Sequence, residues 1–462
     1  MPTFVFSGPV SGPSPARRAS CRFRRPHWAG TVIHALLAIS CMPAFADVFT
    51  VGGGGTHASI QSAIDTAAAN QGNHEIRVRQ GFHAERLQIN VSPGSLDISG
   101  GWNSGFTSQN LDLWNTQVSA SLSGRPLTIT GGSGSLRIAG MAFTGGLGVD
   151  ADGGGVSIRM LGPSSVTLDT ISIAFNSLQA LPGRTAMGTG LYAQILNSAQ
   201  LVVSGCFVHR NNTTLSSSPA TAAIALVSGF GAQIRLADCE VSENAVATGG
   251  LDYAVGIFGA AAGGQIEIEH NRIVDHPAPF PDQRAVDLVV AGEQPIRFER
   301  NTVIGNGEAV QVHISAVAAI APPIVIRNNL IAFGGAGISG NGGSVLSDVS
   351  FNTIVGNTRF GLGNSPWMDW NNNIVFGNGI DSLIPPSLPK SNLVGIDPRF
   401  VDPANQDFRL AADSPARDVA VAVPGFTPPN VDLDGFPRPS GVNHDVGAYE
   451  FDADSVFANG FD

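Results

Sequence analysis

A short pattern of apolar and polar positions recurs along the chain between residues 165 and 378. Each copy has an apolar residue on either side of a polar one, then two or three polar positions, a small residue or asparagine, and another apolar position. Because side chains in a strand alternate between its two faces, this period of two predicts short strands with one buried face. An asparagine closes most copies, and the closing positions are 176, 211, 244, 276, 306, 334, 357 and 378.

The spacing of these copies predicts a solenoid. It falls from 35 residues (176 to 211) to 21 residues (357 to 378). A unit of this length that holds only short strands and turns is typical of one solenoid coil. The longer early units predict longer loops, such as 178–191 and 213–223, on a face where solenoids commonly bind ligands. We therefore expect an all-β fold with parallel β-helix coils over residues 151–384.

One position in each copy, directly after the first strand, lines up from coil to coil. Because coils stack at the strand spacing of about 4.8 Å, asparagines at this position can pass amide hydrogen bonds along the stack. Two neighbouring copies carry cysteine there, within reach of a disulfide that would stabilise the fold by roughly 3–4 kcal/mol. Two stacked free thiols are the alternative. The position holds Ile171, Cys206, Cys239, Asn271, Asn301, Asn329, Asn352 and Asn373.

A short helix is expected ahead of the coils. Residues 60, 63, 64, 67 and 68 are apolar and share one helix face, with Ser59 as N-cap and Gly72 as the stop. The first coil of a solenoid exposes its core unless something covers it. We therefore predict an N-terminal capping helix within 47–150, followed by the first coils.

Residues 1–46 have the features of a signal peptide. Five arginines lie between residues 17 and 25, an apolar stretch spans 31–40, and Ala44-Phe45-Ala46 supplies a cleavage pattern. The apolar stretch is too short to span a bilayer. Lipidation at Cys41 is the alternative. We expect a protein that is secreted or displayed at the cell surface, without a transmembrane span.

Removal of this segment makes the chain strongly acidic. Five of the 25 basic residues are lost and none of the 36 acidic ones, which leaves a formal charge of −16. Nucleic-acid binding requires the opposite charge. Glycans, surface proteins or a divalent cation such as Ca²⁺ fit this charge better.

Motifs at both ends resemble those of known proteins. Ile60-Gln61-x-Ala63-Ile64-Asp65, Ile76-x-Val78-x-x-Gly81 and the segment 98–103 resemble the opening of right-handed parallel β-helix proteins of the pectin-lyase-like superfamily. The segments 397–418, 432–439 and 445–450 resemble the choice-of-anchor Q module of exported β-helix proteins. The resemblance implies fold and export, with such a module over 385–453 and a terminal tail over 454–462. It implies no particular chemistry.

Two outward glutamates are the candidate catalytic pair. Glu269 and Glu299 fall on neighbouring coils, with carboxylates roughly 5 Å apart, the separation that retaining glycosidases use. Like charges this close raise one pKa, as an acid–base pair requires. The competing interpretation is a solvated face of alternating charge, because Arg235, Glu267 and Arg297 alternate in the adjacent column.

A candidate metal site lies in the C-terminal module. Asp432 and Asp434 precede the turn residue Gly435, and Asp445 is a possible third ligand for Ca²⁺. The third acidic position and distant glutamate of an EF-hand are missing. An ordinary Asp-Gly turn is the alternative.

The remaining signals favour a protein that does not cleave its ligand. The only lysine, Lys390, follows the coils, which argues against the β-helix lyases that use a lysine base. The tryptophans available to stack on sugars, among them Trp102, Trp114 and Trp367, fall near the two ends of the chain. We expect an exported, non-catalytic β-helix protein that acts in surface attachment or in glycan or protein interaction. The alternative is a polysaccharide lyase or glycoside hydrolase with a groove along the coils.

Overall fold

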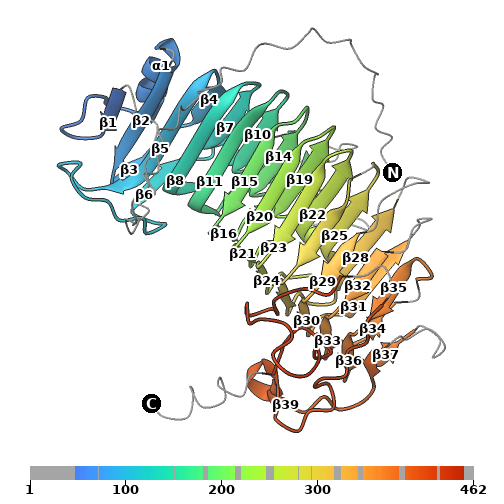
Figure 1. Cartoon of the computed structure of the whole chain (residues 1–462). Helices are drawn as coiled ribbons and strands as arrows, with labels where there is room; N and C mark the ends of the chain where they lie inside the picture. The colour runs from blue at the N-terminus through green and yellow to red at the C-terminus, as the bar shows by residue number, and fades with distance from the viewer. Residues whose placement is uncertain are drawn as a thin grey trace, which may run out of the picture. The chain divides into compact units, whose positions relative to one another are not determined.

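The computed structural model describes residues 47–451 except 71, 150, 180–185, 214–219, 246–253, 279, 293, 317–323, 342–346, 364, 384–390 and 424–426. The predicted signal peptide, the terminal tail and Lys390 lie outside the described residues. The described coils stack as a parallel β-helix, in which each strand pairs in parallel with its counterpart in the next coil (Figure 1). The predicted all-β solenoid is confirmed.

One sheet of 11 strands receives a single strand from each coil. Its strands are β4 (Leu87–Val91), β7 (Leu127–Gly131), β10 (Val156–Met160), β14 (Leu191–Ile195), β19 (Ile224–Gly229), β22 (Ala254–Ala262), β25 (Arg284–Val290), β28 (Val310–Ala316), β31 (Ala336–Asn341), β34 (Phe360–Leu362) and β37 (Ile380–Ser382).

A second sheet of 22 strands wraps the rest of each coil. From β15 to β36 each coil gives it two consecutive strands, and the last coil adds β38 alone. We call the two sets the first row and the second row. The first row holds β15 (Gln200–Ser204), β20 (Gln233–Ala237), β23 (Gln265–Glu269), β26 (Ile296–Glu299), β29 (Val325–Arg327), β32 (Ser347–Ser350) and β35 (Met368–Asn371). The second row holds β16 (Phe207–His209), β21 (Glu240–Ser242), β24 (Arg272–Val274), β27 (Thr302–Ile304), β30 (Leu330–Ala332), β33 (Thr353–Val355), β36 (Ile374–Phe376) and β38 (Leu393–Val394).

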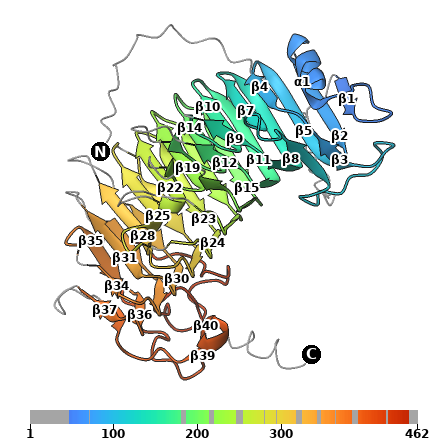
Figure 2. The ribbon, with the colours of Figure 1, turned by 180° about the vertical axis from the view of Figure 1, so that it is seen from behind.

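Some strands of the early coils are longer, and β11 spans both rows because it pairs with β15 and with β16. The strands are β1 (Asp47–Val51), β2 (Gly72–Arg79), β3 (Gly81–His83), β5 (Gly94–Trp102), β6 (Thr116–Ser119), β8 (Gly134–Thr144) and β11 (Ser164–Ala174). Two small sheets lie elsewhere. One consists of β9 (Leu147–Val149), β12 (Ser177–Gln179) and β17 (Asn212–Thr213), seen in part in Figure 2, and the other pairs β13 (Ala186–Met187) with β18 (Ala220–Thr221).

Alternation along each strand builds the core. On β15, for example, Leu201 and Val203 are buried, whereas Val202 between them is only partly buried. Parallel register places the same inward positions of successive coils above one another, so Leu201 aligns with Ile234 and then with Ile266. These residues join one apolar cluster that extends from Val51 to Val375. Burial of this continuous stack is the main force that holds the coils together.

A tight turn separates the two rows. One residue takes the left-handed conformation, with φ between 51° and 58° at Thr170, Gly205, Asp238, His270 and Arg300. The next residue is the aligned position predicted from the sequence. There the backbone N–H and side-chain amide of Asn271 donate to Asn301 Oδ1 over 2.9 and 3.0 Å. The same arrangement continues through Asn329, Asn352 and Asn373 to Asn392. The predicted asparagine ladder is confirmed.

A second ladder runs along the closing positions of the coils. The backbone N–H groups of Asn176 and Asn211 donate to the side-chain oxygen of the asparagine one coil further on. Asn244 N–H donates to His276 Nδ1 over 3.2 Å, so the histidine takes the place of an asparagine. All four side chains are buried. These positions therefore hold the turn after the second row together.

The capping helix α1 spans Ile60–Ala69. Ser59 is its N-cap and its hydroxyl accepts from Ser62 N–H, as predicted, and Ile60 and Ile64 are buried. The predicted stop at Gly72 is wrong. The helix ends at Ala69 because Asn70 already adopts an extended backbone, and Gly72 begins β2.

The C-terminal segment folds back onto the second row (Figures 1 and 2). It contains β39 (Phe400–Asp402), the 3-10 turn η1 (Pro403–Asn405) and β40 (Asp407–Leu410). Its apolar residues Phe408, Leu433, Ala448 and Tyr449 pack on outward residues of β24, β27, β30 and β33, among them Val274, Ile304, Leu330 and Val355. The segment therefore covers the outer face of the late coils.

Candidate functional site

The two candidate glutamates face outward from the first row in matched register, Glu269 on β23 and Glu299 on β26. Glu269 accepts a hydrogen bond from Arg235 Nε over 2.6 Å and one from Arg300 Nη2 over 3.1 Å. Glu299 Oε1 lies 3.5 Å from Arg297 Nη1. Each carboxylate therefore has an arginine partner.

These partners decide the electrostatics of Glu269. Burial alone would raise the pKa of Glu269, but the hydrogen bonds and charges of Arg235 and Arg300 outweigh it and hold this pKa below its ordinary value. The expected rise in pKa from repulsion by Glu299 is therefore not found at Glu269. A carboxylate with a lowered pKa stays ionised at neutral pH, which disfavours Glu269 as the general acid and is compatible with the nucleophile of a retaining pair. Its environment is that of a charge network on a strand face.

Two of the three candidate metal ligands, Asp432 and Asp445, accept hydrogen bonds from backbone N–H groups. Asp432 accepts from the backbone N–H groups of Phe436 (2.8 Å) and Glu450 (3.0 Å). Asp445 accepts from those of Asp418 and Phe451, both over 2.6 Å. Asp434 instead faces a cavity between the segment and the coils. Across the described residues no three His, Cys, Asp or Glu side chains converge as a metal-binding group. Asp432 takes part in the turn that the alternative interpretation expects, and a Ca²⁺ site at Asp432, Asp434 and Asp445 stays a prediction.

A buried ion pair between Arg438 and Glu450 lies at the centre of the C-terminal segment. Arg438 Nη1 lies 2.8 Å from Glu450 Oε1, and both side chains are fully buried. The guanidinium also donates to the carbonyl oxygens of Asp445 and Gly447. Burial raises the pKa of Glu450, which Arg438 partly opposes. The acidic and basic residues of this segment thus hold its loops together.

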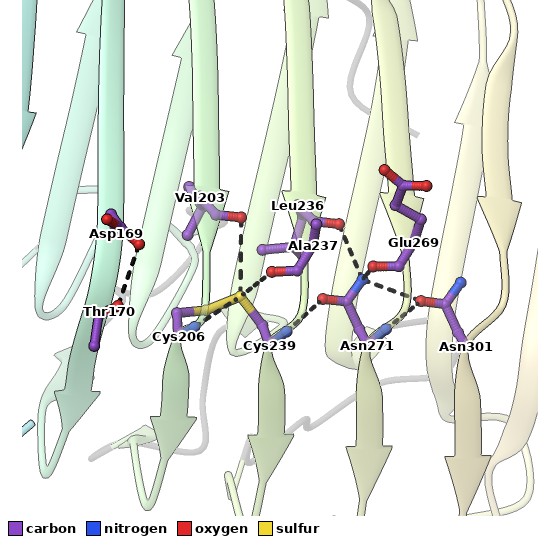
Figure 3. The surroundings of a disulfide bond; sticks show 10 residues. All are labelled: Asp169, Thr170, Val203, Cys206, Leu236, Ala237, Cys239, Glu269, Asn271 and Asn301. Atoms are coloured by element: carbon purple, nitrogen blue, oxygen red, sulfur yellow. Dashed lines mark hydrogen bonds between the residues drawn. A yellow bond between two sulfur atoms is a disulfide. The ribbon is translucent and has the colours of Figure 1, made fainter. Parts of the chain in front are cut away.

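Cys206 and Cys239 form a disulfide with their Cα atoms 4.4 Å apart. The bond occupies the ladder position of two neighbouring coils. Cys239 N–H donates to Asn271 Oδ1 over 3.0 Å, so the asparagine ladder begins where the disulfide ends (Figure 3). The bond covalently joins two coils at a point where side-chain amides are missing.

A second polar group lies outward on the 11-stranded sheet. Asp287, His313 and Ser339 stand in register on β25, β28 and β31. His313 Nδ1 lies 2.8 Å from the Ser339 hydroxyl, and its other ring nitrogen lies 3.3 Å from the Ser315 hydroxyl. Burial and the charge of Arg284 lower the pKa of His313 to about 3.

This column resembles a nucleophile–base pair but lacks two features of one. A histidine with so low a pKa is a weak base at neutral pH. A catalytic triad also directs the far imidazole nitrogen to a carboxylate, whereas here the ring lies between two serine hydroxyls. Asp287 is engaged by Arg284 over 2.8 Å. The column therefore satisfies buried polar groups.

Four aromatic rings gather on the outward side of the second row, and we call them the aromatic platform. They are Trp114 from the loop between β5 and β6, Phe175 from the turn after β11, and Phe207 and His209 from β16. The ring centroids of His209 lie 4.1 Å from Phe207, 5.4 Å from Phe175 and 5.7 Å from Trp114. The first pair is stacked and the other two are edge-on.

An open cavity of about 350 Å³ lies on the same row, beside the C-terminal segment. Its charged groups form close pairs: His270 Nδ1 lies 2.5 Å from Asp238 Oδ1, and Arg272 Nε lies 3.8 Å from Glu240 Oε2. Such a surface offers hydrogen-bond donors and acceptors side by side, which suits hydroxyl-rich ligands. The ionisable residues that line the cavity are Asp238, Glu240, His270, Arg272, Arg300 and Asp434.

Sequence reasoning missed the platform and the cavity. The signal available was a second register column, one residue after the ladder position, which reads Ser172, Phe207, Glu240, Arg272 and Thr302. The position of Trp114 near one end of the sequence also does not keep it away from the later coils. Trp114 belongs to an early loop, yet its ring reaches His209 on a later coil.

No helix in the described part of the chain has the length and apolarity that a membrane span needs. No family model matches the chain, and no curated protein matches it. Among solved structures, the pectate lyase Pel9A superposes with a TM-score of 0.53 at 14% identity, over 88% of this chain and 97% of that one. Escherichia coli YbhC gives a TM-score of 0.29 at 11% identity, over 64% of this chain and 80% of that one, and carries no argument. The likeness to Pel9A is one of fold: this chain is built on a pectate lyase-like parallel β-helix.

Proposed function

We propose that this protein is an exported β-helix protein that binds glycans at or near the cell surface without cleaving them. The observation that carries the proposal is the engagement of both Glu269 carboxylate oxygens, by Arg235 over 2.6 Å and by Arg300 over 3.1 Å, which leaves the catalytic candidate occupied by structural partners. Paired charges still bind sugar hydroxyls, because each pair presents a donor beside an acceptor.

The C-terminal segment has a place in this proposal. Its motifs resemble an anchor module, and it packs on the late coils through Phe408, Leu433 and Tyr449. Attachment through this segment would leave the outer face of the earlier coils exposed to ligands. The formal charge of −16 after export favours neutral glycans over polyanions.

The test compares binding with turnover on the same substrates. The exported chain is run through native gels that contain soluble β-glucan, galactomannan, xylan or polygalacturonate, with and without Ca²⁺, and the same mixtures are assayed for new reducing ends and unsaturated products. We expect retardation by at least one neutral polysaccharide without products. Glu269→Gln/Glu299→Gln should behave like the exposed control Glu308→Gln. Products that disappear only in the double variant would establish an enzyme and overturn the proposal.

A further inference from the structure

We propose that the aromatic platform binds one pyranose ring of a neutral glycan, an inference that rests on the proposed function and gives it a place on the surface. The platform comes from three separate parts of the chain, which parallel stacking brings together on one face. It lies on the second row and is distinct from the glutamates of the first row.

The exposure of two rings points to a ligand. Trp114 and Phe175 remain 36% and 49% exposed although their ring centroids lie 6.3 Å apart. Large aromatic rings gathered in an exposed patch are typical of interaction surfaces. The C–H bonds on one face of a pyranose carry a small positive charge, and an aromatic face is negative, so the two surfaces attract each other.

His209 holds the platform in place. It is 8% exposed, and three aromatic neighbours contact its ring. Burial lowers the pKa of His209, and the charge of Arg210 lowers it further, so the imidazole is neutral at physiological pH. The neutral ring adds no charge to the platform. Rings that are already packed lose little conformational freedom when a ligand binds.

A polar rim lies beside the rings. Arg210 follows His209, and its Nε donates to Glu243 Oε2 over 2.6 Å. The two side chains are 55% and 51% exposed, so their remaining donors and acceptors face solvent. A sugar ring stacked on the platform presents equatorial hydroxyls at its edge, where a neighbouring guanidinium and carboxylate can bind them. An apolar face with a polar rim matches a pyranose and not a purely apolar ligand.

The C-terminal segment covers the outward face of the second row on the later coils. The outward column of the second row runs through Ala174, His209, Ser242, Val274 and Ile304. From Val274 onward it lies beneath Phe408, Leu433 and Tyr449 of the C-terminal segment. The apolar cluster that the segment forms with the coils includes Val274 but not Phe207 of the platform. The platform is therefore the aromatic part of this face that the segment leaves open to a ligand.

The experiment measures affinity-gel retardation of the full exported chain by the four polysaccharides named above. Trp114→Ala and Phe175→Ala are the test variants. Trp367→Ala and Phe230→Ala are matched controls, because both rings are exposed (41% and 62%) and lie outside the platform. We expect each test variant to weaken binding of the neutral polysaccharide by roughly tenfold or more, and the controls to bind like the parent chain. Melting temperatures of all four variants establish that they are folded.

The outcomes separate the two proposals. If the parent chain binds no polysaccharide, both the proposed function and the platform are overturned. If the parent chain binds but the test variants bind equally well, glycan recognition stands and the platform assignment is wrong. Equal weakening by test and control variants also overturns it. Preference for polygalacturonate over the neutral polymers would overturn the assignment of a neutral ligand.

Discussion

The buried pair between Arg438 and Glu450 leads to a quantitative prediction about the C-terminal segment. Arg438→Met keeps most of the side-chain volume but removes the guanidinium. Glu450 would lose its cation, and the carbonyl oxygens of Asp445 and Gly447 would lose their donors. Removal of one partner from a buried ion pair costs about 3–5 kcal/mol. We expect this loss to appear as local opening of the segment.

Native-state hydrogen exchange measures that opening directly. Leu433 N–H donates to the Ala448 carbonyl within the segment, and Gly447 N–H donates to the Asn372 carbonyl of a coil, so the first amide exchanges when the segment opens and the second when it detaches from the coils. A long solenoid does not unfold in one step, which makes a local measurement preferable to a global melt. At about 1.4 kcal/mol per tenfold, exchange should accelerate by roughly two to three and a half orders of magnitude.

The matched control is Arg399→Met in the same segment. Arg399 Nη1 lies 2.7 Å from Asp413 Oδ2, but the side chains are 57% and 70% exposed. An exposed pair contributes little, so exchange at Leu433 and Gly447 should hardly change. Equal acceleration of exchange in both variants, or none in Arg438→Met, would mean that burial does not make the Arg438–Glu450 pair essential to the segment.

Three further predictions concern the coils. Burial lowers the pKa of His276 to about 3. The stability that depends on its neutral form is therefore present above pH ~6.5 and is lost as the pH falls towards 3, by about 2 kcal/mol at pH 5. The melting temperature of His276→Asn should fall less between pH 7 and 5 than that of the parent chain. The Cys206→Ala/Cys239→Ala variant should lose about 3.7 kcal/mol, from the loop-entropy relation applied to the 33-residue separation, and thiol titration of the folded parent should find both sulfurs blocked. Asn301→Ala removes the acceptor of the Asn271 N–H, which should cost about 1–3 kcal/mol and speed exchange of that amide; unchanged exchange would contradict the ladder's role.

The coils were predictable because their constraints are local and repeated. A period of two, a fixed turn and an aligned asparagine recur in each unit, and stacking then follows from strand spacing. Asn271 and Asn301 could therefore be placed on neighbouring coils from the sequence alone. The second ladder was not foreseen, because His276 interrupts the run of asparagines although its ring nitrogen accepts the same hydrogen bond.

The site was harder to predict because it depends on side-chain geometry across coils. Register placed Glu269 beside Glu299 correctly, but the sequence did not reveal that Arg300, from the turn between the rows, reaches Glu269. Trp114 lies in a loop without periodicity, so no pattern aligned it with Phe175 and His209. The acidic motif at Asp432 and Asp445 suggested a metal, but the backbone N–H groups from which both carboxylates accept could not be seen in the sequence.

A hydrogen-exchange footprint of the full chain, with and without the polysaccharide that retards it most, shows where the ligand binds. Recognition on the aromatic platform predicts added protection in the peptides that contain Trp114 and the strand Phe207–His209, with no change over β23 and β26. Protection confined to the 11-stranded sheet, or centred on Glu269 and Glu299, would contradict recognition on the aromatic platform and indicate a groove along those strands.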